Sequence, residues 1–216
     1  CTTDDPVDSL EWHKVLAEDD TFEVKVLPAW RPDKAMNIEK PEYLDYLKTL
    51  SDVSGITVNS FASLMDALRN RMEFFASMGC CVSDHALEYV MYKPYTTEEI
   101  EKIFAKRFAG ETITVDEMNK FKTAFMVSVG KEYNKLNWVM QLHYGTIRDN
   151  NTLRYNQLGP DTGYDCINTY DCSAEMAQFL NALNITDELP KTIIYSLNPS
   201  VNAAIGTVLG CFQDSK

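Results

Sequence analysis

Histidine is scarce in this sequence, and the metal-binding patterns that it usually forms are missing. The chain has three histidines among 216 residues, His13, His85 and His143, and no two of them are two residues apart. Its six cysteines show no CxxC spacing and no paired histidines nearby. A protein metal site ordinarily needs about three or four such ligands. These absences give a structural zinc site little support and favour free thiols in a reducing cytoplasm.

Long apolar runs and clusters of basic residues are missing as well. No stretch approaches the roughly 18 apolar residues of a membrane span, and no charged-then-apolar signal opens the chain. Acidic residues outnumber basic ones by 32 to 20, giving a net charge of -12 that repels a phosphate backbone. We therefore expect a soluble, cytoplasmic protein with no nucleic acid and no membrane as partner. An anionic small molecule remains open, because one or two buried arginines outweigh a distant, screened surface charge.

Internal repeats, low-complexity tracts and Gly/Ser linkers are also absent, so residues 1–216 are expected to form a single domain. Hydrophobic residues make up 45% of the chain, enough for one sizeable core. Apolar, β-rich runs alternate with helical patterns, which is typical of an α/β fold with a parallel sheet built from β/α units. The expected strands are 22–29, 79–82, 138–142 and 192–197, with a further strand ending at Cys1.

Helix start signals lie between these strands. Residues 95–136 are expected to be largely helical, and because the stretch exceeds what one crossover needs, we interpret it as a helical insertion within one β/α unit. A helix is also expected over 60–78, where apolar residues recur at helical spacing. The predicted caps are Asp5 before Pro6, Ser60, the capping boxes of Thr96 with Glu99 and Thr114 with Glu117, Ser173, and Asn198 before Pro199.

Polar residues follow the predicted strands. Functional groups of a (β/α) barrel lie at the carboxyl ends of its strands, which is where Asp4, Arg31, Asp84, His143 and Asn198 are expected. Guanidinium binds a carboxylate through two parallel hydrogen bonds, whereas His and Asp can transfer protons. The pattern therefore indicates a pocket for a substrate that carries a carboxylate.

Each candidate has a structural alternative. Arg31 could pair with Asp33 or with a helix end. Asp84 could be only the N-cap of a following helix, and His143 could be a hydrogen-bonded core histidine. Two further histidines are weaker candidates, because one lies on a predicted helix and the other is expected to point away from Asp84: His13 and His85.

Seven segments in order along the chain resemble the uronate (glucuronate) isomerases of the amidohydrolase barrel superfamily. They are CTTDDP (1–6), RPDKA (31–35), SDH (83–85), MQLHYG (140–145), RDNNT (148–152), LGPDTG (158–163) and LPKTIIYSLNP (189–199). The resemblance runs from end to end of this chain but covers only about half of the family's length. It implies a partial (β/α)8 TIM-type barrel of about five consecutive β/α units, the middle part of a metal-dependent-hydrolase-like barrel.

The resemblance also implies an activity, that of an intramolecular oxidoreductase in hexuronate catabolism. Members isomerise D-glucuronate to D-fructuronate and D-galacturonate to D-tagaturonate by moving a proton between C2 and C1 through a cis-enediol. By resemblance, Arg31 binds the hexuronate carboxylate, and Asp84 and His143 match polar catalytic positions whose individual roles stay open. The family's divalent metal, such as zinc, is held mainly by a His-x-His pair at the first strand and an Asp at the last. Neither is in this chain, so no metal ligand is assigned.

The missing ends suggest that the chain is an internal fragment, carrying the second to the sixth strands of the barrel. Five of eight strands leave two open parallel edges, so we expect the bare chain to be inactive. Two alternatives remain, a metal-dependent hydrolase of the same superfamily and a non-catalytic truncated barrel module. A homo-oligomer also remains open.

Overall fold

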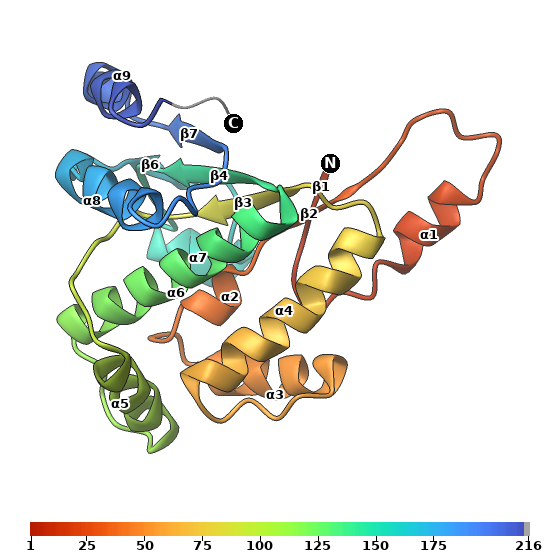
Figure 1. Ribbon diagram of the computed structural model, residues 1–216, viewed down its shortest axis with the longest axis horizontal. Coiled ribbons are helices and arrows are strands. Elements are labelled where there is room, and N and C mark those ends of the chain that lie inside the picture. Colours follow the sequence, from red (N-terminus) through yellow and green to blue (C-terminus); the bar gives the residue numbers. More distant parts are fainter. Residues whose placement is uncertain (214–216) are drawn as a thin grey trace.

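The computed structural model describes residues 1–213, and its centre is a parallel sheet of five strands in the order β1-β2-β3-β4-β7 (Figure 1). The strands are β1 (Thr2–Asp4), β2 (Pro28–Trp30), β3 (Val82–Ala86), β4 (Val139–Tyr144) and β7 (Thr192–Ser196). Each strand pairs in parallel with the next strand of that order. The predicted α/β class with a parallel sheet of five strands is therefore confirmed.

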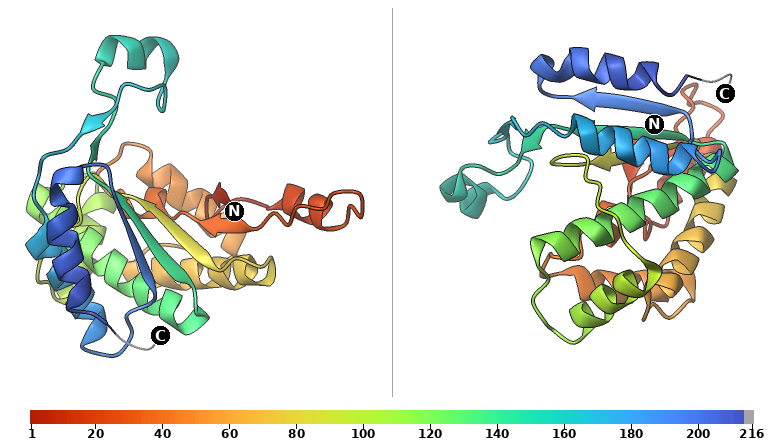
Figure 2. Two further views of the ribbon diagram at one scale, coloured as in Figure 1. Left: turned by 90° about the horizontal axis from the view of Figure 1, so that it is seen from above. Right: turned by 60° about the vertical axis from the view of Figure 1, so that its left-hand side comes forward.

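Helices connect the strands, and a short antiparallel ladder interrupts the last connection. The ladder joins β5 (Thr146–Ile147) to β6 (Cys166–Ile167) around α7 (Thr152–Leu158), and it stands out from the sheet (Figure 2). The other helices are α1 (Glu11–Ala17), α2 (Asp33–Met36), α3 (Tyr43–Ser54), α4 (Phe61–Ser77), α5 (Thr97–Phe108), α6 (Val115–Leu136), α8 (Ser173–Asn184), η1 (Pro199–Val201) and α9 (Asn202–Gly210). None of the helices within residues 1–213 has the length and hydropathy of a membrane span.

One hydrophobic core lies between the helices and one face of the sheet. Trp30 is fully buried there, with the ring of Phe75 from α4 edge-on at 5.0 Å and that of Trp138 at 6.1 Å. Side chains alternate in β4, where Met140, Leu142 and Tyr144 are buried and the residues between them are partly exposed. The sheet thus has one face packed against helices and one open face.

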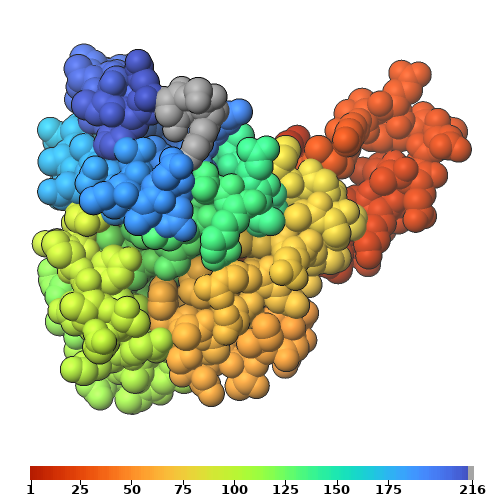
Figure 3. All heavy atoms as spheres, in the orientation of Figure 1, coloured from red at the N-terminus to blue at the C-terminus, as the bar shows by residue number. Residues whose placement is uncertain are grey.

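The predicted strand over 22–29 was largely wrong. Only its last two residues belong to β2, and Phe22 and Val24 are exposed. The chain that carries α1 projects from the body as an arm (Figure 3), whereas Pro6 and Asp8 before it still accept hydrogen bonds from Arg71 of α4. Residues 22–27 follow this arm and pair with no strand among residues 1–213. The strand expected to end at Cys1 instead spans Thr2–Asp4. The strand expected over 79–82 was also displaced, because β3 spans Val82–Ala86 and shares only Val82 with that range.

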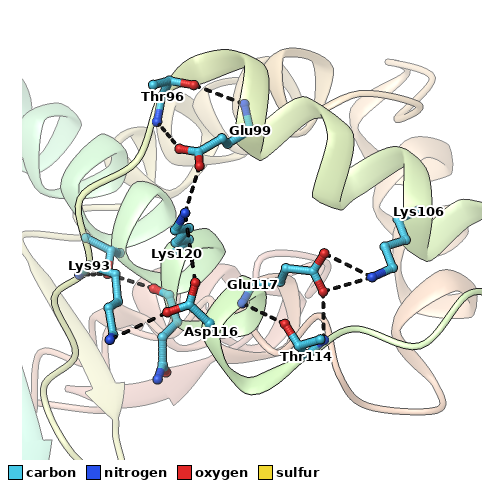
Figure 4. A network of polar contacts seen from close by, with 10 residues as sticks. Lys93, Thr96, Glu99, Lys106, Thr114, Asp116, Glu117 and Lys120 are labelled. Atoms are coloured by element: carbon cyan, nitrogen blue, oxygen red, sulfur yellow. Dashed lines mark hydrogen bonds and ion pairs between the residues drawn. The ribbon is translucent and has the colours of Figure 1, made fainter.

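The helix starts were predicted more accurately. Both capping boxes are present, at Thr96 with Glu99 and at Thr114 with Glu117, and two helices occupy most of 95–136 (Figure 4). The N-caps Ser60 and Asn198 are confirmed by their side-chain hydrogen bonds. Two cap predictions were wrong. No helix follows Asp5, because residues 6–7 form a turn, and Ser173 begins α8 while its own N–H donates to the Asp171 carboxylate.

Candidate active site

The open face of the sheet collects polar side chains from neighbouring strands. Asp84 lies on β3 and His143 on β4, where His143 pairs with Ala86. Because strand residues alternate between faces, Asp84 and Ala86 share one face, and His85 lies on the other. His85 is fully buried and His143 is not, which fits this alternation.

Three candidate residues meet on this face. One carboxylate oxygen of Asp84, Oδ1, lies 3.2 Å from Nε2 of His143. The other, Oδ2, lies 3.5 Å from Nη1 of Arg31 and accepts a 3.0 Å hydrogen bond from the Thr3 hydroxyl. The Asp84 side chain is only 14% exposed, whereas Arg31 is 32% and His143 43% exposed. The Asp84 carboxylate is thus largely enclosed, while the side chains of Arg31 and His143 are more exposed. We call Thr3, Arg31, Asp84 and His143 the strand-end cluster.

Arg31 is fixed by two carboxylates. Its Nε donates to Oδ2 of Asp33 at 3.0 Å, and Asp84 faces its Nη1. Burial lowers the pKa of Arg31, but the charges of Asp33 and Asp84 outweigh burial, so the pKa is raised and the guanidinium stays charged. Among residues 1–213, no hydrogen bond or ion pair engages Nη2. That edge of the guanidinium can receive an anionic ligand.

Two members of this face were missed in the sequence. Tyr195 of β7 stacks on His143, with ring centroids 4.3 Å apart and planes at 2°. Thr3 of β1 reaches Asp84 across β2. The available signal for Tyr195 was the pairing of β4 with β7, which sets it opposite His143, but that register cannot be read from one sequence.

The other two predicted residues also lie at strand ends, Asp4 as the last residue of β1 and Asn198 just after β7, but their side chains have other partners. Asp4 points to the opposite face, where Oδ2 accepts a 2.7 Å hydrogen bond from Thr2 and lies 3.7 Å from Nε2 of His13. Asn198 caps η1 by accepting from the N–H of Ser200. The Asp4 carbonyl accepts a 2.9 Å hydrogen bond from the N–H of Arg31, but among residues 1–213 neither the Asp4 nor the Asn198 side chain bonds to a side chain of the strand-end cluster.

Of the purely structural roles considered for the three candidates, those for Asp84 and His143 were wrong, and the one for Arg31 is present. Asp84 is not an N-cap, because it lies inside β3 and the next helix begins only at Thr97. His143 is not a core histidine, because its side chain is 43% exposed. The pairing of Arg31 with Asp33 is present, but it accompanies the contact with Asp84.

The strand-end cluster does not fit a divalent cation. Within residues 1–213, no group of three or more His, Cys, Asp or Glu side chains could hold a metal ion. Asp84 and His143 supply two donors, and the guanidinium of Arg31 beside Asp84 would repel a second cation. No metal-dependent step is therefore derived from these residues.

A cavity lies beside the strand-end cluster rather than inside it. It measures about 570 Å³ and is lined by the segment after β3, by α6 and by the β5 region. Its lining includes the buried Lys122, whose Nζ lies 2.8 Å from the Glu39 carboxylate. Arg31, Asp84 and His143 are not among its lining residues. The polar face and this cavity meet at Ala86, whose backbone N–H donates to Oδ2 of the Asp33 side chain.

A parallel β/α sheet with interacting charged side chains where neighbouring strands end defines a class, the (β/α)-barrel enzymes, of which these five strands form a part. The comparisons with known proteins specify the family. The family model described as glucuronate isomerase matches residues 1–216, and the chain belongs to this family.

Relatives and solved structures agree with that assignment. The uronate isomerases of Lachnospira eligens and Lachnoclostridium phytofermentans are 87% and 75% identical over the whole chain. A crystal structure of the Thermotoga maritima uronate isomerase covers 98% of the chain with a TM-score of 0.91 and 35% identity. The Caulobacter crescentus glucuronate isomerase covers 93% with a TM-score of 0.84 and 25% identity. This chain spans 46% of each of the first three proteins and 41% of the fourth, about half their length.

Proposed function

We propose that this chain supplies two parts of a uronate isomerase: the arginine that binds the substrate carboxylate and a pair of residues that transfer the proton. The reaction is the aldose-ketose isomerisation of D-glucuronate to D-fructuronate and of D-galacturonate to D-tagaturonate. The observation that carries the proposal is the strand-end cluster, in which one largely enclosed carboxylate, Asp84, faces both Arg31 and His143. The family assignment supports the substrate class.

The chemistry needs an anchor and a proton carrier. Arg31 binds the hexuronate carboxylate through the guanidinium edge that Asp33 and Asp84 leave open. His143 and Asp84 can both accept and return a proton near neutral pH, whereas an arginine cannot. The proton moves between C2 and C1 through a cis-enediol. A divalent metal, if the whole enzyme uses one, is held by residues outside this chain.

The activity belongs to the longer protein, in the cytoplasm, where hexuronates are catabolised. A chimera tests the proposal: these 216 residues replace the matching segment of the Lachnospira eligens uronate isomerase, which is 87% identical over that length. We expect the chimera to isomerise D-glucuronate. Arg31→Met should raise KM for D-glucuronate by about 10- to 100-fold, because a hydrogen bond to a charged group contributes roughly 1.5–3 kcal/mol.

Arg69→Met is the matched control. Arg69 lies on α4 and pairs with Asp66 and Glu132, remote from the strand-end cluster. We expect it to leave KM unchanged. An inactive chimera beside an active parent enzyme, or equal KM values for the two variants, contradicts the proposed function.

A further inference from the structure

His85 lies directly behind the strand-end cluster, on the helix-facing side of β3. Its side chain is fully buried. One ring nitrogen, Nε2, lies 3.1 Å from the hydroxyl of Tyr133 on α6. The other, Nδ1, has no hydrogen-bond partner among residues 1–213. A buried ring nitrogen without a partner is costly, so its surroundings are informative.

The group facing Nδ1 is Asp33, the residue that holds Arg31. Oδ2 of Asp33 accepts from Nε of Arg31 at 3.0 Å and from the N–H of Ala86 at 3.1 Å. Oδ1 of Asp33 is buried and also without a partner among the described residues, and it lies 3.8 Å from Nδ1 of His85. Two buried, unpartnered polar atoms thus face each other across a gap that a small side-chain rotation closes.

The contact with Tyr133 fits either tautomer of His85, because a hydroxyl both donates and accepts, and the carboxylate oxygen that faces Nδ1 favours the form with its proton on Nδ1. Burial raises the pKa of Tyr133 well above its ordinary value, so its hydroxyl keeps its proton. A Tyr133 hydroxyl that donates to Nε2 leaves the proton on Nδ1, directed at Asp33. Tyr133, His85, Asp33 and Arg31 then form one chain of hydrogen bonds from the core to the open face.

We propose that His85 is a positioning residue: it donates from Nδ1 to Asp33 and thereby fixes the guanidinium of Arg31 for substrate binding. The inference rests on the proposed function, since it concerns the binding of the substrate carboxylate by Arg31. His85 touches neither substrate nor reacting atoms, and it acts only through Asp33. Losing it should therefore weaken uronate binding and leave the proton-transfer step nearly unchanged.

Two amide variants of the chimera distinguish the roles of the two ring nitrogens of His85. Asn places its amide near the position of Nδ1, and Gln places it near Nε2, so His85→Asn can keep the donor to Asp33 and His85→Gln cannot. We expect His85→Gln to raise KM for D-glucuronate about tenfold with kcat within about twofold, and His85→Asn to recover most of the loss. In an Arg31→Met background, His85→Gln should raise KM no further, because both act through one contact.

His13→Gln is the control, because His13 is also buried but contacts Thr2 and Asp4 instead. If His85→Gln matches His13→Gln while Arg31→Met still raises KM, the positioning role is wrong and the proposed function stands. If Arg31→Met leaves KM unchanged, the proposed function itself fails. A measurement on unsubstituted His85 keeps the test independent of folding: nitrogen-15 NMR of its ring should show the Nδ1–H form, and an Nε2–H form overturns the inference.

Discussion

At the scale of single residues, Asp84 organises the strand-end cluster. It is the shared partner of Thr3, Arg31 and His143, and its side chain is less exposed than those of Arg31 and His143. A largely enclosed carboxylate that contacts both Arg31 and His143 holds the two side chains in place. Removing its charge should therefore affect the orientation of His143 and the environment of Arg31 together.

In the chimera, Asp84→Asn should lower kcat by about 10²- to 10⁴-fold, the range expected for loss of a general acid-base group or of its orienting partner. The amide is nearly the same size, so the change removes charge rather than volume. Steady-state kinetics with D-glucuronate measures the effect. Asp52→Asn, on the exposed side of α3, is the control and should match the parent. A kcat for Asp84→Asn equal to that of Asp52→Asn would show that Asp84 has no part in turnover.

The cysteines provide a test of burial that needs no activity. Burial raises the pKa of Cys80 to about 11, and it also raises that of Cys172, so both remain protonated thiols near neutral pH. Four thiols are exposed: Cys1, Cys81, Cys166 and Cys211. Iodoacetamide labelling of the native chain, read by mass spectrometry, should modify these four first. Cys80 and Cys172 should react only in denaturant, and rapid native labelling of Cys80 would contradict the packing described for it.

Sequence reasoning located three cluster members for one physical reason. Parallel strands end at the same edge, so Arg31, Asp84 and His143 were expected together before any coordinates. The same rule also placed Asp4 and Asn198 at strand ends, where they do lie, but it does not say which face or which partner a side chain takes. A shift of one residue in a strand reverses the face, and strand bounds are not that accurate from sequence.

At the scale of elements, helices α5 and α6 begin where their sequences specify. In each, a Thr accepts from the N–H three residues on, while a Glu accepts from the N–H of the Thr (Figure 4). Such local signals are complete within four residues, so sequence alone identifies them. Strand β2 shows the opposite case, because residues 22–27 alternate like a strand but have no partner strand.

Removal of the cap hydroxyls should destabilise the chain. Thr96→Ala and Thr114→Ala each leave a backbone N–H at the helix start without its partner, which should lower the free energy of unfolding by about 1 kcal/mol. Urea denaturation followed by circular dichroism measures it. Thr112→Ala, in the loop before α6, is the control. A Thr114→Ala variant as stable as Thr112→Ala would mean that the capping box contributes nothing.

The same capping box predicts a dependence on pH. Hydrogen bonds from the Thr114 backbone and from Lys106 lower the pKa of Glu117 from 4.5 to about 2. A lowered pKa in the folded state stabilises it above pH 4.5, and this contribution is lost as the pH falls towards 2. The stability difference between the parent chain and Glu117→Gln should therefore shrink between about pH 5 and pH 3. Because Glu117 is partly exposed, the effect should be small, and a difference that grows with acid would contradict the assignment.

At the scale of the whole molecule, the helix-facing side of the sheet is covered and the other face is open. On β7 and just after it, Ile193, Tyr195 and Leu197 are each more than two-fifths exposed. Strands β1 and β7 lie at the two edges of the sheet, with no further strand paired to them among residues 1–213. The order of five parallel strands was predictable from alternating β/α patterns, but the exposure of this face follows only from the pairing.

These exposed apolar side chains give the bare 216-residue chain a predicted tendency to associate. Unpaired edges and an exposed apolar face both favour contacts between copies. Sedimentation velocity should show self-association that grows with concentration, and uronate isomerisation by the chain alone should be absent. The double variant Ile193→Thr and Leu197→Thr should reduce association, whereas Val115→Thr should not, because Val115 is equally apolar and 69% exposed but lies on α6. If the double variant associates like Val115→Thr, the open face is not the surface through which copies meet, and the edges of β1 and β7 must account for the contacts.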